Sequence, residues 1–498
     1  MNPSAVKNLI ILVLCGVIAI VLGSVISSQS YDNLLLLSYL LVGMYVVAAP
    51  GFVPLIAFGS LNPFILPLPF IWNVPFMAII LAVCCVKLFF YKAISKEQFV
   101  YRNCFTWSTF AFFALVVLRY GLNPVFPNTS GFGANVTGFR SYLNYAICGA
   151  LVFFIPFFFR KREDVVKLIR WTGAISLFFI LFFLPFAFSK SMFAAMWLRR
   201  FGLFVATFDN GLLRFVVLPG FGLNLLILSF FPNIIPLPRW IRVTMAVLGI
   251  AAIVLGGNRG SFLMGIIMVI AILLIRGRRT MVGVSLAASV LLFGAFYYIG
   301  EQLDVREGVG FLRILSIGSQ RVARESGAVD SVEWRMVRWK RAMIEIEAHP
   351  LVGKGYGGLE NAWIWSDWAQ FDEARVEADL ASGGIHNGYI TAAYSLGIPA
   401  LIFFLIAIGG QIVANIKVIR QSGASDPLLT DLSIYILANL IGLMPSIYIG
   451  TDLNSPLIWL YMALGTLLIR MNKEKVTEQP EAVAAPQVVR IFPKRIPV

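Results

Sequence analysis

Long apolar runs alternate along the chain with short polar segments, most of which are basic. A membrane-spanning helix needs about 20 apolar residues to cross roughly 30 Å of hydrocarbon, and many runs approach that length. The candidate spans are 9–26, 34–49, 52–70, 73–91, 104–120, 143–159, 171–189, 212–231, 243–257, 261–276, 281–300, 387–416, 429–449 and 456–471. This pattern predicts an all-α polytopic membrane protein with about 12–14 transmembrane helices.

Two of these runs have features that affect how they are interpreted. The run 9–26 is interpreted as the first span, because no convincing small-residue cleavage site of a signal peptide follows it. The run 52–70 contains Pro54, Pro63, Pro67 and Pro69, and we expect a distorted crossing there.

The basic segments predict the orientation. Lys and Arg concentrate in cytoplasmic loops of membrane proteins, so the formal charge of +15 indicates a topology and not a nucleic-acid partner. The short basic segments all fall on one side of the membrane if every candidate run crosses it. They are 91–102, 160–170, 238–242, 276–279 and 417–420.

This topology divides the chain into five parts and leaves a large loop on the outer side. The parts are an N-terminal transmembrane bundle (1–190), helices with outer-face arginine motifs (191–300), a large, partly helical outer loop (301–384), C-terminal transmembrane helices (385–471) and a disordered cytoplasmic tail (472–498). All five cysteines lie in or beside apolar runs, so neither a disulfide framework nor a cysteine metal site is expected.

Arginines at two outer turns are candidates for binding an anion. "LGGNRGSF" (255–262) joins two short apolar arms, so Arg259 should lie below the outer surface, where an unpaired arginine is costly. Ser261 could cap the helix that follows, whose N-terminus also favours an anion. Near "LRRFGLFVATFDNGLLRF" (198–215), Arg199, Arg200 and Arg214 fit either an anion site or contacts with phospholipid headgroups.

The outer loop contains an amphipathic segment, "EWRMVRWKRAMIEIEAHPLVGKGYGG" (333–358). Its apolar face is expected to comprise Met336, Trp339, Met343 and Ile346, with Arg335 at its edge, and such a helix can lie on the membrane surface. Pro350 and the following glycines should end the helix, and His349 is expected to be structural.

His386 stands where the loop re-enters the membrane, at the start of "HNGYITAAYSLGIPALIFFL". The dipole at a helix N-terminus disfavours imidazolium, so His386 should be neutral, as a general base must be. Arginines can neutralise a diphosphate while such a base removes a proton from an attacking hydroxyl. The pattern therefore predicts transfer from a lipid-diphosphate donor. A lone histidine that anchors the interface is the alternative.

These motifs together resemble the C-terminal signature of the O-antigen ligase and O-antigen polymerase (Wzy-type) superfamily. An Arg-x4-Trp pattern leads into a Pro-Leu-x-Gly-x-Gly turn, and a His-Asn pair then opens a helix. "GGNRGSF" is similar to the family's Ser-Arg turn, with Asn258 where Ser is usual. "RRFGLFVATFDN" is similar, less closely, to an Arg-x-x-Gly stretch of the family. The resemblance covers about residues 195–470.

The resemblance implies an inverting, metal-independent glycosyltransferase without a cofactor in the bacterial inner membrane, with its active site facing the periplasm. The donor would be a glycan on undecaprenyl diphosphate, and the acceptor a glycan or lipid A-core. His386 would activate the acceptor hydroxyl, and Arg259, Arg335 and Arg200 would bind the diphosphate. Asn387 and Arg338 are candidates for orienting the base or the acceptor.

Three functions remain open at this point. A polymerase of O-antigen or exopolysaccharide is favoured, while a ligase to lipid A-core or to protein needs the same donor site and base. A lipid or solute transporter lined by the same arginines is the alternative from a different class. Tryptophans that could stack on sugars occur in the outer loop, at Trp363, Trp365 and Trp368.

Overall fold

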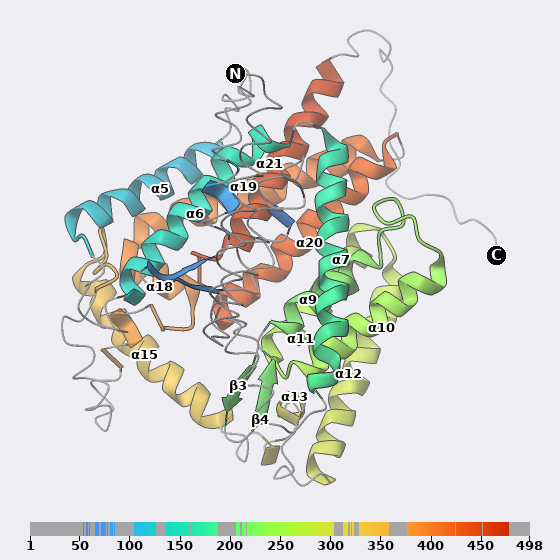
Figure 1. The fold of residues 1–498 in the computed structure, drawn as a ribbon, viewed down its shortest axis with the longest axis horizontal. Coiled ribbons are helices and arrows are strands. Elements are labelled where there is room, and N and C mark those ends of the chain that lie inside the picture. The colour runs from blue at the N-terminus through green and yellow to red at the C-terminus, as the bar shows by residue number, and fades with distance from the viewer. Residues whose placement is uncertain are drawn as a thin grey trace, which may run out of the picture.

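The computed structural model describes most of the chain from residue 104 to residue 477 (Figure 1). The described ranges are 104–125, 136–159, 161–187, 206–209, 212–215, 217–302, 312–316, 328–357, 383–423, 425–450 and 452–477, with shorter pieces between 53 and 84, at 319–322 and at 376–381. The predicted spans 9–26 and 34–49 lie outside them.

Helices dominate the described residues. They are α5 (Cys104–Leu122), α6 (Val136–Phe158), α7 (Arg162–Ala187), α9 (Leu218–Leu228), α10 (Arg239–Leu255), α11 (Arg259–Ile275), α12 (Arg279–Gln302), α13 (Leu312–Leu315), α15 (Ala328–Ala348), α18 (Gly388–Leu396), α19 (Ile398–Ser422), α20 (Pro427–Ile449) and α21 (Pro456–Thr477). Two short antiparallel hairpins accompany them, β1 (Ile65–Leu68) with β2 (Ile71–Pro75) and β3 (Ala206–Asp209) with β4 (Leu212–Phe215).

Five described helices are long and apolar enough to cross a membrane, which confirms the polytopic α-helical class. Their apolar spans are Gly138–Pro156, Arg162–Phe183, Arg279–Gln302, Ile398–Ser422 and Pro427–Ile449. The total of about 12–14 crossings stays a prediction, because much of the chain before residue 104 is not described.

Three predicted spans differ from the structure. The run 387–416 is divided at Gly397 into α18 and α19, and the run 212–231 is divided into strand β4 and the 11-residue helix α9. Within the run 52–70, residues 65–68 form strand β1. Hydropathy is uniform across each of these runs, so it does not reveal the breaks that glycine and proline introduce.

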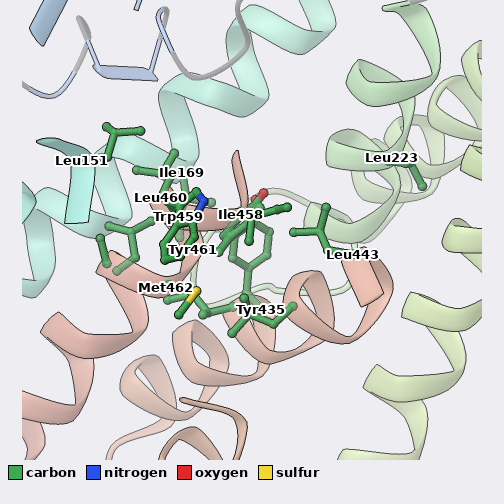
Figure 2. Packing of buried hydrophobic residues seen from close by; sticks show 14 of the residues in the cluster. Leu151, Ile169, Leu223, Tyr435, Leu443, Ile458, Trp459, Leu460, Tyr461 and Met462 are labelled. Carbon is green, nitrogen blue, oxygen red and sulfur yellow. The ribbon is translucent and has the colours of Figure 1, made fainter. Parts of the chain in front are cut away.

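The core lies where α20 and α21 pack against α6, α7 and α19 (Figures 1 and 2). Trp459 of α21 is fully buried, and its ring packs on those of Phe112 and Phe113 at centroid distances of 5.1 and 4.7 Å. Helices α9 and α10 pack closely at two glycines, Gly222 and Gly249. The approach leaves no room for a side chain, since a Cβ on Gly222 would lie only 2.5 Å from the carbonyl oxygen of Gly249. This core fixes the ends of the helices that surround the site.

The basic segments that the structure describes, between 161 and 170 and at 238–242, 276–279 and 417–420, gather at one end of the bundle. Arg162 forms a 2.9 Å ion pair with Asp426, and Arg276 forms a 2.6 Å ion pair with Asp431. Arg170 donates a 2.7 Å hydrogen bond to the carbonyl oxygen of Ile234 in the same region. Segments that hydropathy assigned to one side of the membrane are therefore joined by direct contacts. Described residues of the outer loops meet at the opposite end of the helices, where Arg119 donates to the carbonyl oxygen of Lys354 and a Cβ on Gly138 would lie 3.3 Å from the carbonyl oxygen of Tyr356.

Candidate active site

Helix α15 holds the segment that leads to His386. The guanidinium of Arg338 donates to the carbonyl oxygen of Gly384 at 2.7 Å, and the indole N–H of Trp339 donates to that of Ile385 at 3.0 Å. Arg338 is buried, with 6% of its surface exposed. The two residues before His386 are thus fixed by side chains of one helix turn.

The Pro-Leu-x-Gly-x-Gly turn docks on the break between α18 and α19. A Cβ on Gly353 would lie 2.6 Å from the backbone nitrogen of Gly397, and a Cβ on Gly397 would lie 2.3 Å from the carbonyl oxygen of Leu351. Both glycines have positive φ, 69° and 91°, which other residues adopt only at a cost. Three backbone hydrogen bonds of 2.7–3.1 Å run from Lys354 N to Tyr394 O, from Gly355 N to Ser395 O and from Ile398 N to Pro350 O.

Helix α5 supports the same turn from outside the motif region. The guanidinium of Arg119, in the last turn of α5, donates to the carbonyl oxygen of Lys354. A Cβ on Gly355 would lie 2.7 Å from that guanidinium. The N-terminal part of the chain therefore contributes directly to the shape of the site.

His386 occupies a strained backbone position before α18. Its φ is 56°, and it is the one non-glycine residue with positive φ in the described part of the chain. Asn387 is the N-cap of α18, and its side-chain oxygen accepts from the backbone N–H of Tyr389 at 3.1 Å and of Ile390 at 3.2 Å. Strain of this kind concentrates at functional sites, and the cap keeps the backbone beside His386 in place.

The imidazole of His386 is neutral at pH 7. The pKa of His386 is lowered from 6.5 to about 4. Loss of water around the ring is the largest cause, although the residue reaches the surface, and the positive charges of Arg338 and Arg335 contribute the rest. The sequence predicted a neutral imidazole from the helix dipole, whereas desolvation and arginine charge are its causes in the structure.

The C-terminal end of α20 connects the Arg259 turn with His386. A Cβ on Gly260 would contact the Ile449 side chain at 3.4 Å, and a Cβ on Gly450 would lie 3.9 Å from Nδ1 of His386. Arg259 is the first residue of α11. Ile449, the last residue of α20, and Gly450, its C-cap, therefore meet the two motif turns.

The short arms around Arg259 agree with the structure. Helices α10 and α11 each have 17 residues, about 25 Å of helix against roughly 30 Å of hydrocarbon. The predicted cap is wrong, however. Asn258 caps α11 by accepting from the backbone N–H of Gly260 at 3.0 Å and of Ser261 at 3.3 Å. An Asn side chain caps as well as Ser does, and here it stands at the required position.

The remaining predictions concern Arg200, the loop tryptophans and the apolar face of α15. Arg200 and the loop tryptophans Trp363, Trp365 and Trp368 lie outside the described residues. The expected apolar face of α15 is divided: Ile346 is buried and Trp339 is partly buried against a small apolar cluster, whereas Met336 and Met343 are 46% and 47% exposed.

Sequence reasoning missed two residues beside this site. Asp452, after α20, is a largely buried carboxyl whose pKa is raised to about 6, because loss of water outweighs the opposing effect of a hydrogen bond with Thr391 of α18. Among the described residues its Oδ1 takes no hydrogen bond. Tyr448 lies at the end of α20 against Trp339. Tyr448 lies at the end of the apolar run 429–449 and Asp452 follows it, and only tertiary packing brings Tyr448 against Trp339 and Asp452 against Thr391.

The comparison with protein families agrees with the motifs. Residues 244–405, about a third of the chain, match the family described as O-antigen ligase. The match includes Arg259, Arg335 and His386, and it confirms the resemblance to the O-antigen ligase and polymerase superfamily. No curated protein sequence matches the chain.

The family and the fold together define the general class. The chain is a multi-pass membrane protein whose residues 244–405 match the O-antigen ligase family, and this match indicates an enzyme of the membrane glycosyltransferase kind. Lipid-linked glycans and their acceptors are the substrates that this class implies in general.

Proposed function

We propose that the protein transfers a glycan from undecaprenyl diphosphate to an acceptor sugar hydroxyl at the periplasmic face of the bacterial inner membrane. The acceptor is a second lipid-linked glycan, so the protein acts as a polysaccharide polymerase. The observation that carries the proposal is the neutral, strained His386 beside Arg335, with the Arg259 turn at the same end of α20.

His386 acts as the general base. One imidazole nitrogen takes the proton of the acceptor hydroxyl while that oxygen attacks the anomeric carbon of the donor sugar. The bond from this carbon to the diphosphate oxygen breaks, and undecaprenyl diphosphate leaves with the electron pair. Attack opposite the leaving group inverts the anomeric configuration, and the imidazolium then releases its proton to water.

The arginines stabilise the leaving group. Arg259 and Arg335 bind the diphosphate by charge-assisted hydrogen bonds, and Arg200 is a third candidate. Arg338 acts indirectly, as a positioning residue. Its guanidinium donates a hydrogen bond to the carbonyl oxygen of Gly384 and so holds the segment before His386. Asn387 contributes by capping α18.

Donor binding also adjusts the base. The pKa of about 4 makes His386 a weak base in the free protein, because general bases work best near the operating pH. A bound diphosphate offsets the charge of Arg335 and Arg338, which removes that part of the lowering and so raises the pKa of His386, while the larger effect of desolvation stays. The base is therefore strongest when the donor is in place.

Ligation to lipid A-core is the second candidate, favoured by the family description of residues 244–405 as O-antigen ligase. The test supplies the purified chain in detergent with a glycan on undecaprenyl diphosphate and, in separate reactions, with a second lipid-linked glycan or with lipid A-core. Extension of the lipid-linked glycan alone supports the polymerase. Transfer to lipid A-core alone supports the ligase, and no transfer to any acceptor contradicts the proposed chemistry.

A further inference from the structure

An aromatic pair lies where α15 meets the end of α20, against the segment that leads to His386. The rings of Trp339 in α15 and Tyr448 in the last turn of α20 have centroids 5.5 Å apart and an interplanar angle of 59°. Trp339 is partly buried, and its indole N–H is bonded to the carbonyl oxygen of Ile385. Tyr448 is 53% exposed. The pair therefore presents one fixed ring and one accessible ring next to the base.

The neighbours of this pair are the candidates for diphosphate binding and for proton removal. Arg335 precedes Trp339 by four residues on α15, so the two side chains lie on one face of the helix. Directly after Tyr448, Ile449 packs near the Arg259 turn and Gly450 approaches the imidazole of His386. The aromatic pair is thus flanked by the arginines and by the base.

We propose that Trp339 and Tyr448 form a stacking platform for the donor pyranose that is joined directly to the diphosphate. This inference rests on the proposed function. In glycosyl transfer that ring carries the carbon under attack, so it must lie between the leaving diphosphate and the base. The pair joins α15, which carries Arg335, to the end of α20, which meets the Arg259 turn and His386. The C–H face of a pyranose complements the negative face of an aromatic ring.

The competing explanation is that Tyr448 anchors α20 at the membrane surface, as tyrosines commonly do. The chain offers a matched control in Tyr298, which is 68% exposed near the end of α12. Replacement of either tyrosine by Ala removes an exposed phenol from one end of an apolar helix. Only Tyr448 is adjacent to the site.

The test measures affinity of the purified full-length chain for two probes. One is undecaprenyl diphosphate, and the other is undecaprenyl diphosphate carrying N-acetylglucosamine. Tyr448→Ala should weaken binding of the sugar-bearing probe roughly tenfold and change binding of the sugar-free probe by less than about twofold. Tyr448→Phe, which keeps the ring, should recover most of that loss, and Tyr298→Ala should change neither affinity.

Two results would overturn the platform. One is unchanged affinity of Tyr448→Ala for the sugar-bearing probe, and the other is an equal loss for both probes, which indicates membrane anchoring. Failure of the proposed function has a different signature, because the wild-type chain would then not bind the sugar-free probe. Trp339→Ala should also weaken binding of the sugar-bearing probe. Because this variant also loses the hydrogen bond to the carbonyl oxygen of Ile385, the Tyr448 variants decide the question.

Discussion

Loss of Arg338 should loosen the segment that carries His386. Its buried guanidinium forms a 2.6 Å ion pair with Asp379 and a 2.7 Å hydrogen bond to the carbonyl oxygen of Gly384. Removal of one partner of a buried pair costs about 3–5 kcal/mol. Because the Asp379 side chain is 31% exposed, we expect Arg338→Met to cost the lower value, about 3 kcal/mol.

Hydrogen exchange at the start of α18 measures this effect locally. The backbone amides of Tyr389 and Ile390 donate hydrogen bonds to the side-chain oxygen of Asn387. Their exchange rates therefore report whether the backbone next to His386 keeps its conformation. A cost of about 3 kcal/mol corresponds to roughly 100-fold faster exchange where local opening limits it.

The matched control is Arg341→Met, one turn further along α15. Arg341 also pairs with an acid, Glu377 at 2.8 Å, but its side chain is 45% exposed. Exposed pairs contribute about 0–1 kcal/mol, so exchange at Tyr389 should change by less than about tenfold. Equal exchange in the Arg338 and Arg341 variants would refute the positioning role of Arg338.

Three further predictions concern the chemistry. Arg259→Lys should keep the charge yet lose most of the transfer activity, because an ammonium cannot form the bidentate bonds of a guanidinium; a wild-type rate would contradict this role. As pH falls, kcat/KM should decline near pH 4, where the free imidazole of His386 gains its proton. The decline in kcat at saturating donor should occur at a higher pH, because the diphosphate offsets the charge of Arg335 and Arg338; coincident declines would argue against this coupling. EDTA should leave the rate unchanged, since arginines balance the charge of the leaving group; loss of activity that Mg²⁺ or Mn²⁺ restores would exclude that mechanism.

The sequence was sufficient for features that depend on local pattern. Hydropathy predicted α5, α10, α11, α12 and α20 to within four residues, whereas α6, α7 and α21 extend further beyond their predicted runs. The short arms around Arg259 follow from run length alone. A rare histidine beside an apolar run identified His386, and the amphipathic segment identified Arg335 at the edge of its apolar face. In the structure the charge of Arg335 acts on the imidazole of His386. Burial of charge in a membrane protein is costly, so such residues are conspicuous in the sequence.

Features that depend on tertiary contact were not predictable from one sequence. The division between α18 and α19 falls at Gly397, where the backbone of Leu351 comes so close that a Cβ on Gly397 would lie 2.3 Å from the Leu351 carbonyl oxygen. The positive φ of His386 has no signature in residue type, and Tyr448 and Asp452 reach the site only through the packing of α20. Arg119 belongs to an N-terminal helix that carries none of the motifs, yet it supports the turn after α15.

The most direct test of the account is His386→Ala in the purified chain, with transfer and donor binding measured on the same preparation. The base acts on the acceptor hydroxyl and not on the diphosphate, so affinity for the undecaprenyl-diphosphate glycan should survive. The rate of transfer should fall by at least about 100-fold, the usual effect of losing a general base. A variant that keeps more than about a tenth of the wild-type rate would contradict the assignment of His386.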